Sequence, residues 1–225
     1  MCGRFAMSAK TKDIEKFKND LKIKPIAPLR QSFNIAPGQN IQGLKNDFHD
    51  FSDFNWGLVP PWADMSDKPL KIINARAETL KQKPAFKRLL NGKRCVILSS
   101  GYYEWQAIGN KKIPNFIFLK NEPLFAFAGL WNTLPSNSES ETEECATIIT
   151  CYSADSISHI HNRMPVILTS ENIEDWLSER KTEELLSPYI SEEIGFHRVS
   201  QFVNSPAHNS EECIVEYEET EKSLF

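Results

Sequence analysis

Residues 94–131 read RCVILSSGYYEWQAIGNKKIPNFIFLKNEPLFAFAGLW, and this stretch decides the fold class. It holds four short runs rich in β-branched and aromatic residues, which is typical of strands: Arg94–Ser99, Tyr102–Gln106, Asn115–Leu119 and Leu124–Trp131. Gly109-Asn110 and Asn121-Glu122-Pro123 supply turns between neighbouring runs. Short strands joined by short turns predict a mixed domain built on antiparallel sheet, not a doubly wound α/β fold.

The flanking sequence extends this pattern with further strands and a few helices. The additional strand-like runs are Phe51–Val59, Leu70–Asn74, Ala146–Cys151 and Pro165–Thr169. Helical patterns cover Thr11–Leu21 with Thr11 as its cap, Pro84–Asn91, the surroundings of Ser153–His159, and Ser170–Ser178 with Ser170 as its cap. The polar, acidic segment Ser136–Glu144 predicts a mobile loop.

Composition excludes several classes of protein. The chain has 225 residues, of which 40% are apolar and 25% charged, as in an ordinary soluble globular protein. Apolar runs stay below the roughly 18 residues of a membrane span, and the first residues lack the apolar stretch of a signal peptide, so we expect a cytoplasmic protein without membrane contact. Five cysteines without a CxxC motif predict reduced thiols, with Cys95 and Cys151 buried as small hydrophobes.

The formal net charge of −4 hides a division of the chain. Residues 1–170 carry 22 Lys and Arg against 16 Asp and Glu, a net of +6. Residues 171–225 carry 4 against 14, a net of −10. The first segment is therefore compatible with a nucleic-acid partner without requiring one, since solvated charged faces are common.

Cys2 is the one cysteine whose position gives it a special chemistry. Removal of the initiator methionine, which is normal before a small residue, would leave Cys2 with an α-amine and a thiol on adjacent carbons. Both groups are partly nucleophilic near neutral pH, because their ordinary pKa values are roughly 8 and 8.5. Such a 1,2-aminothiol reacts with aldehydes to form a thiazolidine ring. The alternative is that Cys2 simply packs as a small hydrophobe.

Three other segments carry candidate catalytic groups. Glu104 lies in an aromatic setting that would raise its pKa towards that of a general acid. Asn74 stands at a strand end two residues before Arg76, and His161 stands two residues before Arg163. Each of these residues also fits a purely structural role. His159 and His161 lack a third ligand at a suitable spacing, so we expect no metal site.

Taken together, these segments resemble a known family. Six motifs occur in its order: Met1-Cys-Gly-Arg, Phe33-Asn-Ile-Ala-Pro-Gly-Gln, Trp56-Gly-Leu-Val-Pro-Pro-Trp, Asn74-Ala-Arg-Ala-Glu-Thr, Gly101-Tyr-Tyr-Glu-Trp and His161-Asn-Arg-Met-Pro. The chain is thus similar, from Cys2 to about Ala207, to the SOS-response-associated peptidase (SRAP) family, whose members crosslink themselves to abasic sites in DNA. The resemblance implies a single α+β domain over residues 1–208, with a mainly antiparallel, curved or barrel-like sheet and peripheral helices, followed by an acidic tail at 209–225.

The resemblance also implies roles for individual residues. Cys2 would be the covalent nucleophile towards an abasic site in single-stranded DNA, Glu104 would transfer protons, His161 would hold or protonate the sugar ring oxygen, and Asn74 would orient the reacting groups. The candidates for phosphate contacts are Arg4, Arg76 and Arg163, and those for stacking on bases are Pro37, Trp62 and Trp105. Trp56, Trp131 and Trp176 are expected in the core.

Two other functions remain open at this point. One is a cysteine peptidase or amidase that uses Cys2 with His161, and the other is a passive single-strand binding module. The family name suggests that Cys2 also removes residues that precede it, whereas strand cleavage would be a side activity. We expect a monomer without a cofactor, located in the cytoplasm, or with the nucleoid if the source is bacterial.

Overall fold

Five strands close into a ring in the computed structural model, which describes residues 2–25, 27–46, 50–60, 62–63, 70–134, 143–180 and 182–218. The ring runs through β4 (Ser52–Trp56), β3 (Asn40–Lys45), β6 (Arg94–Ser99), β9 (Phe125–Thr133) and β10 (Glu144–Tyr152). β10 then pairs back with β4, in parallel, while the other pairs of the ring are antiparallel. The expected α+β class with a mainly antiparallel, barrel-like sheet is confirmed.

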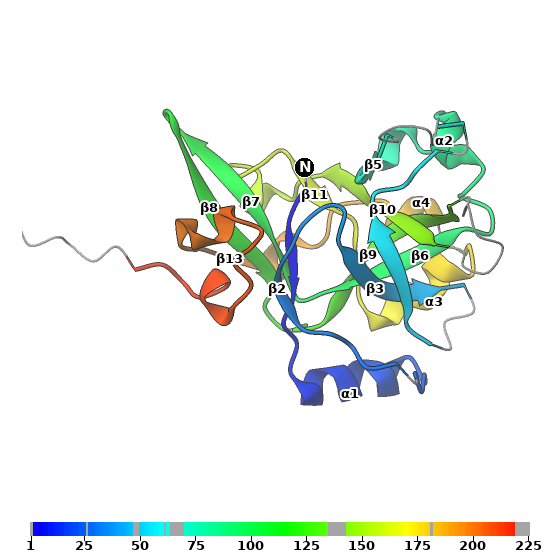
Figure 1. Ribbon diagram of the computed structural model, residues 1–225, viewed down its shortest axis with the longest axis horizontal. Helices are drawn as coiled ribbons and strands as arrows, with labels where there is room; N and C mark the ends of the chain where they lie inside the picture. Colours follow the sequence, from blue (N-terminus) through cyan, green and yellow to red (C-terminus); the bar gives the residue numbers. More distant parts are fainter. Residues whose placement is uncertain are drawn as a thin grey trace, which may run out of the picture.

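A second, antiparallel sheet stands beside the barrel (Figure 1). Its order is β13 (Ile194–Arg198), β8 (Lys111–Leu119), β7 (Gly101–Ile108), β1 (Phe5–Met7) and β2 (Ser32–Ile35). Only Ser100 separates β6 of the barrel from β7 of this sheet. Gly101 permits this crossing, because a Cβ atom on it would lie 2.3 Å from the Phe116 ring.

Three short strands extend the barrel sheet. β5 (Asn74–Arg76) runs parallel to β10, β11 (Arg163–Pro165) runs antiparallel to β10, and β12 (Ile167–Leu168) pairs with β9. β10 is therefore flanked by both β5 and β11, which carry three of the predicted site residues.

The helices are short and lie outside the sheets (Figure 1). The α-helices are α1 (Thr11–Asp20), α2 (Pro84–Lys87), α3 (Ser170–Leu177) and α4 (Thr182–Leu185). The 3₁₀ helices are η1 (Ala77–Thr79), η2 (Asp155–Ile157), η3 (Ser191–Glu193), η4 (Gln201–Asn204) and η5 (Glu211–Cys213). None of the described helices is long and apolar enough to cross a membrane.

Aromatic side chains join the barrel to the second sheet. Phe5 of β1 meets Trp56 and Phe127 edge-on, with ring centroids 5.2 and 5.6 Å apart, and Tyr102 of β7 meets Phe127 at 6.0 Å. Such edge-to-face pairs add to the hydrophobic gain of burial. Trp56 and Trp176 are fully buried, as predicted, whereas Trp131 is only partly buried.

Both predicted helix caps are one residue too late. The carbonyl oxygen of Lys10 already accepts hydrogen bonds from the Asp13 and Ile14 N–H groups, so α1 is capped by Lys10 and not by Thr11. At α3 the cap is Thr169, whose N–H donates to the Asn172 side chain at 3.0 Å, and not Ser170. The sequence around Ser153–His159 forms the 3₁₀ helix η2 instead of an α-helix.

Other expectations met a mixed outcome. All five cysteines are free and Cys95 and Cys151 are buried, as predicted, and the other three are buried as well. Most of the acidic segment Ser136–Glu144 lies outside the described residues, but Glu144 begins β10 and pairs with Lys45. The predicted strand Leu70–Asn74 was placed too early, because only Ile72 forms a bridge there and β5 begins at Asn74.

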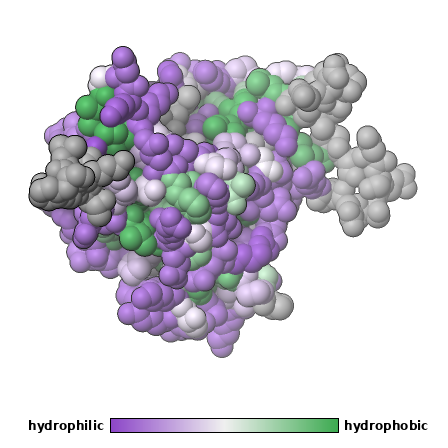
Figure 2. Space-filling model, turned by 60° about the vertical axis from the view of Figure 1, so that its left-hand side comes forward, coloured by the Kyte–Doolittle hydropathy of each residue, from purple (hydrophilic) through white to green (hydrophobic). Residues whose placement is uncertain are grey.

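The surface is mainly hydrophilic on the face that Figure 2 shows, and its apolar residues gather in several separate patches. Large apolar side chains that stand exposed singly are common on protein surfaces, so exposure alone does not mark a site.

Candidate active site

Cys2 lies three residues before the start of β1 and is fully buried. Figure 1 shows the N-terminal end of β1 beside β11 and β5. The side-chain amide of Asn74, the first residue of β5, donates a hydrogen bond of 2.8 Å to the backbone carbonyl oxygen of Cys2. The barrel thereby holds the main chain at Cys2 through the pairing of β5 with β10.

The thiol of Cys2 is a poor acid in this environment. Burial raises its pKa far above the ordinary range, and the negative charge of Glu104 raises it further. The thiol is therefore protonated at neutral pH, in contrast to the low-pKa thiolates of cysteine nucleophiles.

Glu104 projects from β7 and is 4% exposed. Burial raises the pKa of its carboxyl group, and the charge of His161 offsets part of this effect. Glu104 therefore interacts electrostatically with both Cys2 and His161, although the three residues come from separate parts of the chain. A carboxyl group of this kind keeps its proton at a higher pH than an exposed one, as a general acid requires.

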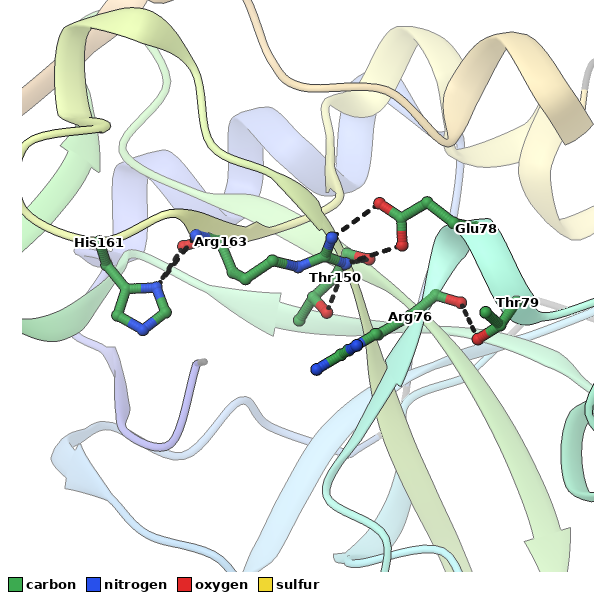
Figure 3. Close-up of polar contacts among 6 residues, drawn as sticks. All are labelled: Arg76, Glu78, Thr79, Thr150, His161 and Arg163. Carbon is green, nitrogen blue, oxygen red and sulfur yellow. Dashed lines mark hydrogen bonds and ion pairs between the residues drawn. The ribbon is translucent and has the colours of Figure 1, made fainter.

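His161 is held by the backbone of Arg163. Its Nδ1 atom accepts a hydrogen bond of 3.0 Å from the Arg163 N–H, which places the proton of the neutral ring on Nε2. The Arg163 carbonyl oxygen lies 3.3 Å from the same Nδ1 atom and can accept a hydrogen bond from it when Nδ1 carries a proton. The backbone thus supports the ring in both protonation states (Figure 3).

Arg163 is buried in a cluster of polar groups (Figure 3). Its two terminal nitrogens donate to the two carboxylate oxygens of Glu78 at 2.7 and 3.0 Å, and one of them also donates to the Thr150 carbonyl oxygen at 2.6 Å. Its guanidinium group also lies over the ring of Tyr152, at 4.9 Å. This two-pronged pairing fixes Arg163 and offsets much of its charge.

The other two predicted phosphate ligands have different surroundings. Arg76 of β5 is exposed, and its side chain points away from Glu78 (Figure 3). Arg4 is half-buried and donates to Asn34 Oδ1 at 2.7 Å and to the Val203 carbonyl oxygen at 2.8 Å. It therefore ties β1 to β2 and η4.

The predicted stacking residues all retain some exposed surface. Trp62 is 62% exposed, and Pro37 is exposed in the loop after β2. Trp105 is partly buried, with its Nε1–H donating to Asn204 Oδ1 at 2.8 Å and the Arg4 guanidinium 5.8 Å from its ring.

The structure thus groups Cys2, Asn74, Glu104 and His161, all predicted from the sequence. Arg163 is surrounded by Glu78, Thr150 and Tyr152, none of which was predicted as a site residue from the sequence. Glu78 belongs to the motif that starts at Asn74 and follows Arg76 by two residues. Its place in this motif was the sequence signal that could have marked it as a site residue. Within the described ranges, no three His, Cys, Asp or Glu side chains are grouped as a metal ion would need.

Comparison with known proteins adds an independent line of support. The profile of the SOS response associated peptidase (SRAP) family matches residues 1–206. Abasic site processing protein YoqW of Bacillus subtilis (strain 168) is 43% identical, over 95% of this chain and 99% of that protein. Abasic site processing protein HMCES of Gallus gallus is 38% identical, over 74% of this chain and 57% of that protein.

The fold has a similar solved structure as well. A crystal structure of a protein from Bacteroides thetaiotaomicron covers 96% of this chain and all of its own, with a TM-score of 0.83 and 28% identity. The match to the family profile over nearly the whole length, together with these relatives, identifies the chain. It belongs to the SOS response associated peptidase (SRAP) family.

Proposed function

We propose that this protein captures abasic sites in single-stranded DNA by forming a covalent thiazolidine through Cys2 once Met1 has been removed. It would act as a monomer and shield the damaged strand from cleavage. Relatives that match nearly its whole length carry the name abasic site processing protein. An abasic sugar exists partly as an open-chain aldehyde, which is the electrophile that a 1,2-aminothiol captures.

The observation that carries this proposal is the burial of Cys2 between Asn74 and Glu104. Burial and the charge of Glu104 raise the pKa of the thiol, which disfavours sulfur as the first nucleophile, so we assign that role to the α-amine. The Asn74 hydrogen bond to the Cys2 carbonyl fixes the backbone that bears this amine. Positioning of this kind accounts for a large share of rate enhancement in enzymes.

The reaction then proceeds in three steps: addition, loss of water and ring closure. The amine nitrogen adds to the aldehyde carbon and gives a carbinolamine. The carbinolamine loses water to form an imine, with Glu104 donating a proton to the departing oxygen and recovering one from the nitrogen. The thiol sulfur adds to the imine carbon while its proton passes to the nitrogen, which closes the five-membered ring.

His161 and the arginines complete this assignment. His161 would hold or protonate the sugar ring oxygen during ring opening and reversal, and its backbone support in both protonation states suits that role. Arg76 is the best placed of the three arginines to contact a phosphate, since it is exposed. Arg4 and Arg163 would act mainly by holding Trp105 and His161 in place.

The same chemistry also limits two minor activities, strand cleavage and autoprocessing. A bare imine acidifies the neighbouring sugar carbon and invites β-elimination, whereas ring closure removes the imine. Strand cleavage should therefore be slow. Autoprocessing would be confined to the Met1–Cys2 bond.

A cysteine peptidase or amidase acting through Cys2 and His161 is the weaker candidate. Such an enzyme needs a thiolate, and the pKa of the Cys2 thiol is shifted in the opposite direction.

The decisive experiment incubates the protein with single-stranded DNA that carries one abasic site and separates the products on a denaturing gel. We expect a shifted band with the wild type and with Cys213→Ala, a control at a buried cysteine far along the chain. Cys2→Ala should give no band without reduction, because its α-amine can form only the reversible imine. Cys2→Ser should give a band only after borohydride reduction of its imine.

Intact-mass analysis of the same samples should find Met1 missing. Absence of the band with Met1-free wild-type protein would refute covalent capture. Cleavage of a peptide panel that requires Cys2 and His161 would favour the peptidase, and a shift on native gels alone would favour passive binding.

A further inference from the structure

We propose that Tyr152 is a stacking platform for a nucleobase of the DNA strand beside the captured sugar. This inference rests on the proposed function and adds a subsite to it. Tyr152 is the exposed last residue of β10, a strand that is otherwise almost entirely buried.

Strand register places Tyr152 on the same face of the sheet as the candidate active site. Asn74 lies opposite Ile148, and Arg76 lies opposite Thr150 in the parallel pair of β5 and β10. Alternate residues of a strand share a face, so Thr150 and Tyr152 point to the side on which Asn74 and Arg76 lie. Arg163 lies opposite Tyr152 in the antiparallel pair of β10 and β11 and shares this face.

Tyr152 is far more exposed than the residues before it in β10. Its side chain is 65% exposed, whereas Thr150 and Cys151 just before it are 0% and 2% exposed. An isolated tyrosine on a strand gains little from folding in such a position, because most of its apolar surface remains in water. The exposed ring is therefore available to a ligand with a flat, apolar face.

The ring also has a charged neighbour that is itself fixed. The Arg163 guanidinium lies 4.9 Å from the ring centroid, and Glu78 and the Thr150 carbonyl fix that guanidinium with short hydrogen bonds. One side of the ring therefore contacts a cation and the rest faces solvent. A ring restrained by such a neighbour loses less conformational entropy when a base stacks on it than a ring without one.

The spacing fits a DNA strand that leaves the active site along β10. Ile148 pairs with Asn74, and Tyr152 follows Ile148 by four positions, which corresponds to about 13 Å along the strand. Arg76 lies between these two levels and is exposed. A strand held at Cys2 would thus meet a cation for its phosphate and then an aromatic ring for its base.

The test measures affinity for single-stranded oligonucleotides that contain a tetrahydrofuran abasic analogue, which has no aldehyde and cannot crosslink. Tyr152→Ala should weaken binding about 5- to 150-fold, Tyr152→Leu should weaken it nearly as much, and Tyr152→Phe should stay close to the wild type. Tyr217→Ala removes another exposed tyrosine, located just after η5, and should change nothing.

A second series of oligonucleotides lacks one base at each flanking position in turn. The penalty of Tyr152→Ala should disappear for the oligonucleotide that lacks the base stacked on the ring, and for that one alone. Equal affinity of Tyr152→Ala and the wild type would overturn the inference. A penalty that is the same for every oligonucleotide would also overturn it, because it would indicate only that Arg163 has been displaced.

Crosslinking by the wild type to a true abasic site separates these results from a failure of the proposed function. If the wild type crosslinks and the Tyr152 variants show no base-dependent effect, only the stacking site is wrong. If the wild type neither binds nor crosslinks, the proposed function itself fails, and the stacking site fails with it.

Discussion

The Asn74 side chain donates its 2.8 Å hydrogen bond to the main chain of Cys2, not to its thiol. Asn74 belongs to β5, which is in register with β10 of the barrel, so the position of the second residue of the chain is set by strands far from it in sequence. A residue so close to a chain end would otherwise fray. The contact ties the backbone of Cys2, and with it the amine of the proposed reaction, to the barrel.

Asn74→Ala should therefore slow crosslinking without abolishing DNA binding. Removal of the hydrogen bond frees the Cys2 backbone, and a displacement of about 1 Å at a reacting group can cost roughly 10²-fold in rate. Asn74→Asp should be slower still, because a carboxylate facing the Cys2 carbonyl oxygen cannot donate a hydrogen bond. Single-turnover crosslinking rates at saturating DNA measure the effect. A rate for Asn74→Ala equal to that of the wild type would show that the contact is irrelevant to chemistry.

Glu104→Gln should stabilise the protein at neutral and higher pH while slowing crosslinking. The pKa of Glu104 is raised by burial, so its contribution to stability is complete below the unfolded pKa and is lost as pH rises through the folded pKa. Glutamine has no charge to bury. The melting temperature of the variant should exceed that of the wild type by a few degrees at pH 8, at about 2–4 °C per kcal/mol, and the difference should shrink towards pH 4.

Thermal melts from pH 4 to pH 8 measure this difference. Glu211→Gln, at an exposed glutamate, is the matched control and should follow the wild type at every pH. A variant that is less stable than the wild type at pH 8 would contradict the assignment of Glu104 as a buried carboxyl group that is costly to ionise.

The outcome at individual strands shows what local sequence can predict. β6 was predicted with its observed bounds, since it is a run of apolar residues buried on both faces. β3 was missed, because Asn40, Gln42 and Gly43 weaken a strand pattern. Gly43 is nevertheless required there, since a Cβ atom on it would lie 1.9 Å from the Val96 carbonyl oxygen. Gly43, which argues against a strand in the sequence, is thus required by the close packing of β3 on β6. This packing is visible only in the folded structure.

The residues of the candidate site likewise fall into a predictable and an unpredictable group. Motif order was enough to predict the residues grouped around Cys2, because each of them lies in its own short motif. The partners of Arg163 were not predictable, since Glu78, Thr150 and Tyr152 meet it only through the pairing of β10 with its two neighbours. The charge of an arginine can be read from the sequence, but whether a carboxylate already neutralises it depends on the fold.

Salt dependence should distinguish the two arginines that flank β10. Arg76 is exposed and should release a counterion on contact with a phosphate, so Arg76→Gln should reduce the slope of log affinity against log salt by about 0.7 for single-stranded DNA. Arg163→Gln should change this slope less, because Glu78 already pairs with Arg163 in the free protein. Binding titrations between 50 and 200 mM salt, with the non-crosslinking analogue, provide the comparison. Equal changes in slope would indicate that Arg163 leaves Glu78 to bind DNA.

Glu78→Gln should destabilise the protein at neutral pH and less so in acid. Burial raises the pKa of Glu78, but the hydrogen bonds and charge of Arg163 outweigh it, so the net pKa is lowered. A group with a depressed pKa stabilises the fold above its unfolded pKa, and this contribution is lost as pH falls through the folded pKa. The loss at pH 7 should be about 1–2 kcal/mol, below that of a fully buried pair because the Glu78 side chain is 36% exposed. This corresponds to a melting temperature about 2–8 °C lower.

The pair of Lys81 and Glu183 offers a matched control, because both of its side chains are exposed. Glu183→Gln should leave the melting temperature unchanged at every pH, since exposed ion pairs contribute little. If the Glu78–Arg163 pair also supports the ring of Tyr152, Glu78→Gln should in addition weaken binding to the non-crosslinking oligonucleotide. That second loss should disappear for the oligonucleotide that lacks the stacked base. A uniform loss across all oligonucleotides would instead assign Glu78 to stability alone.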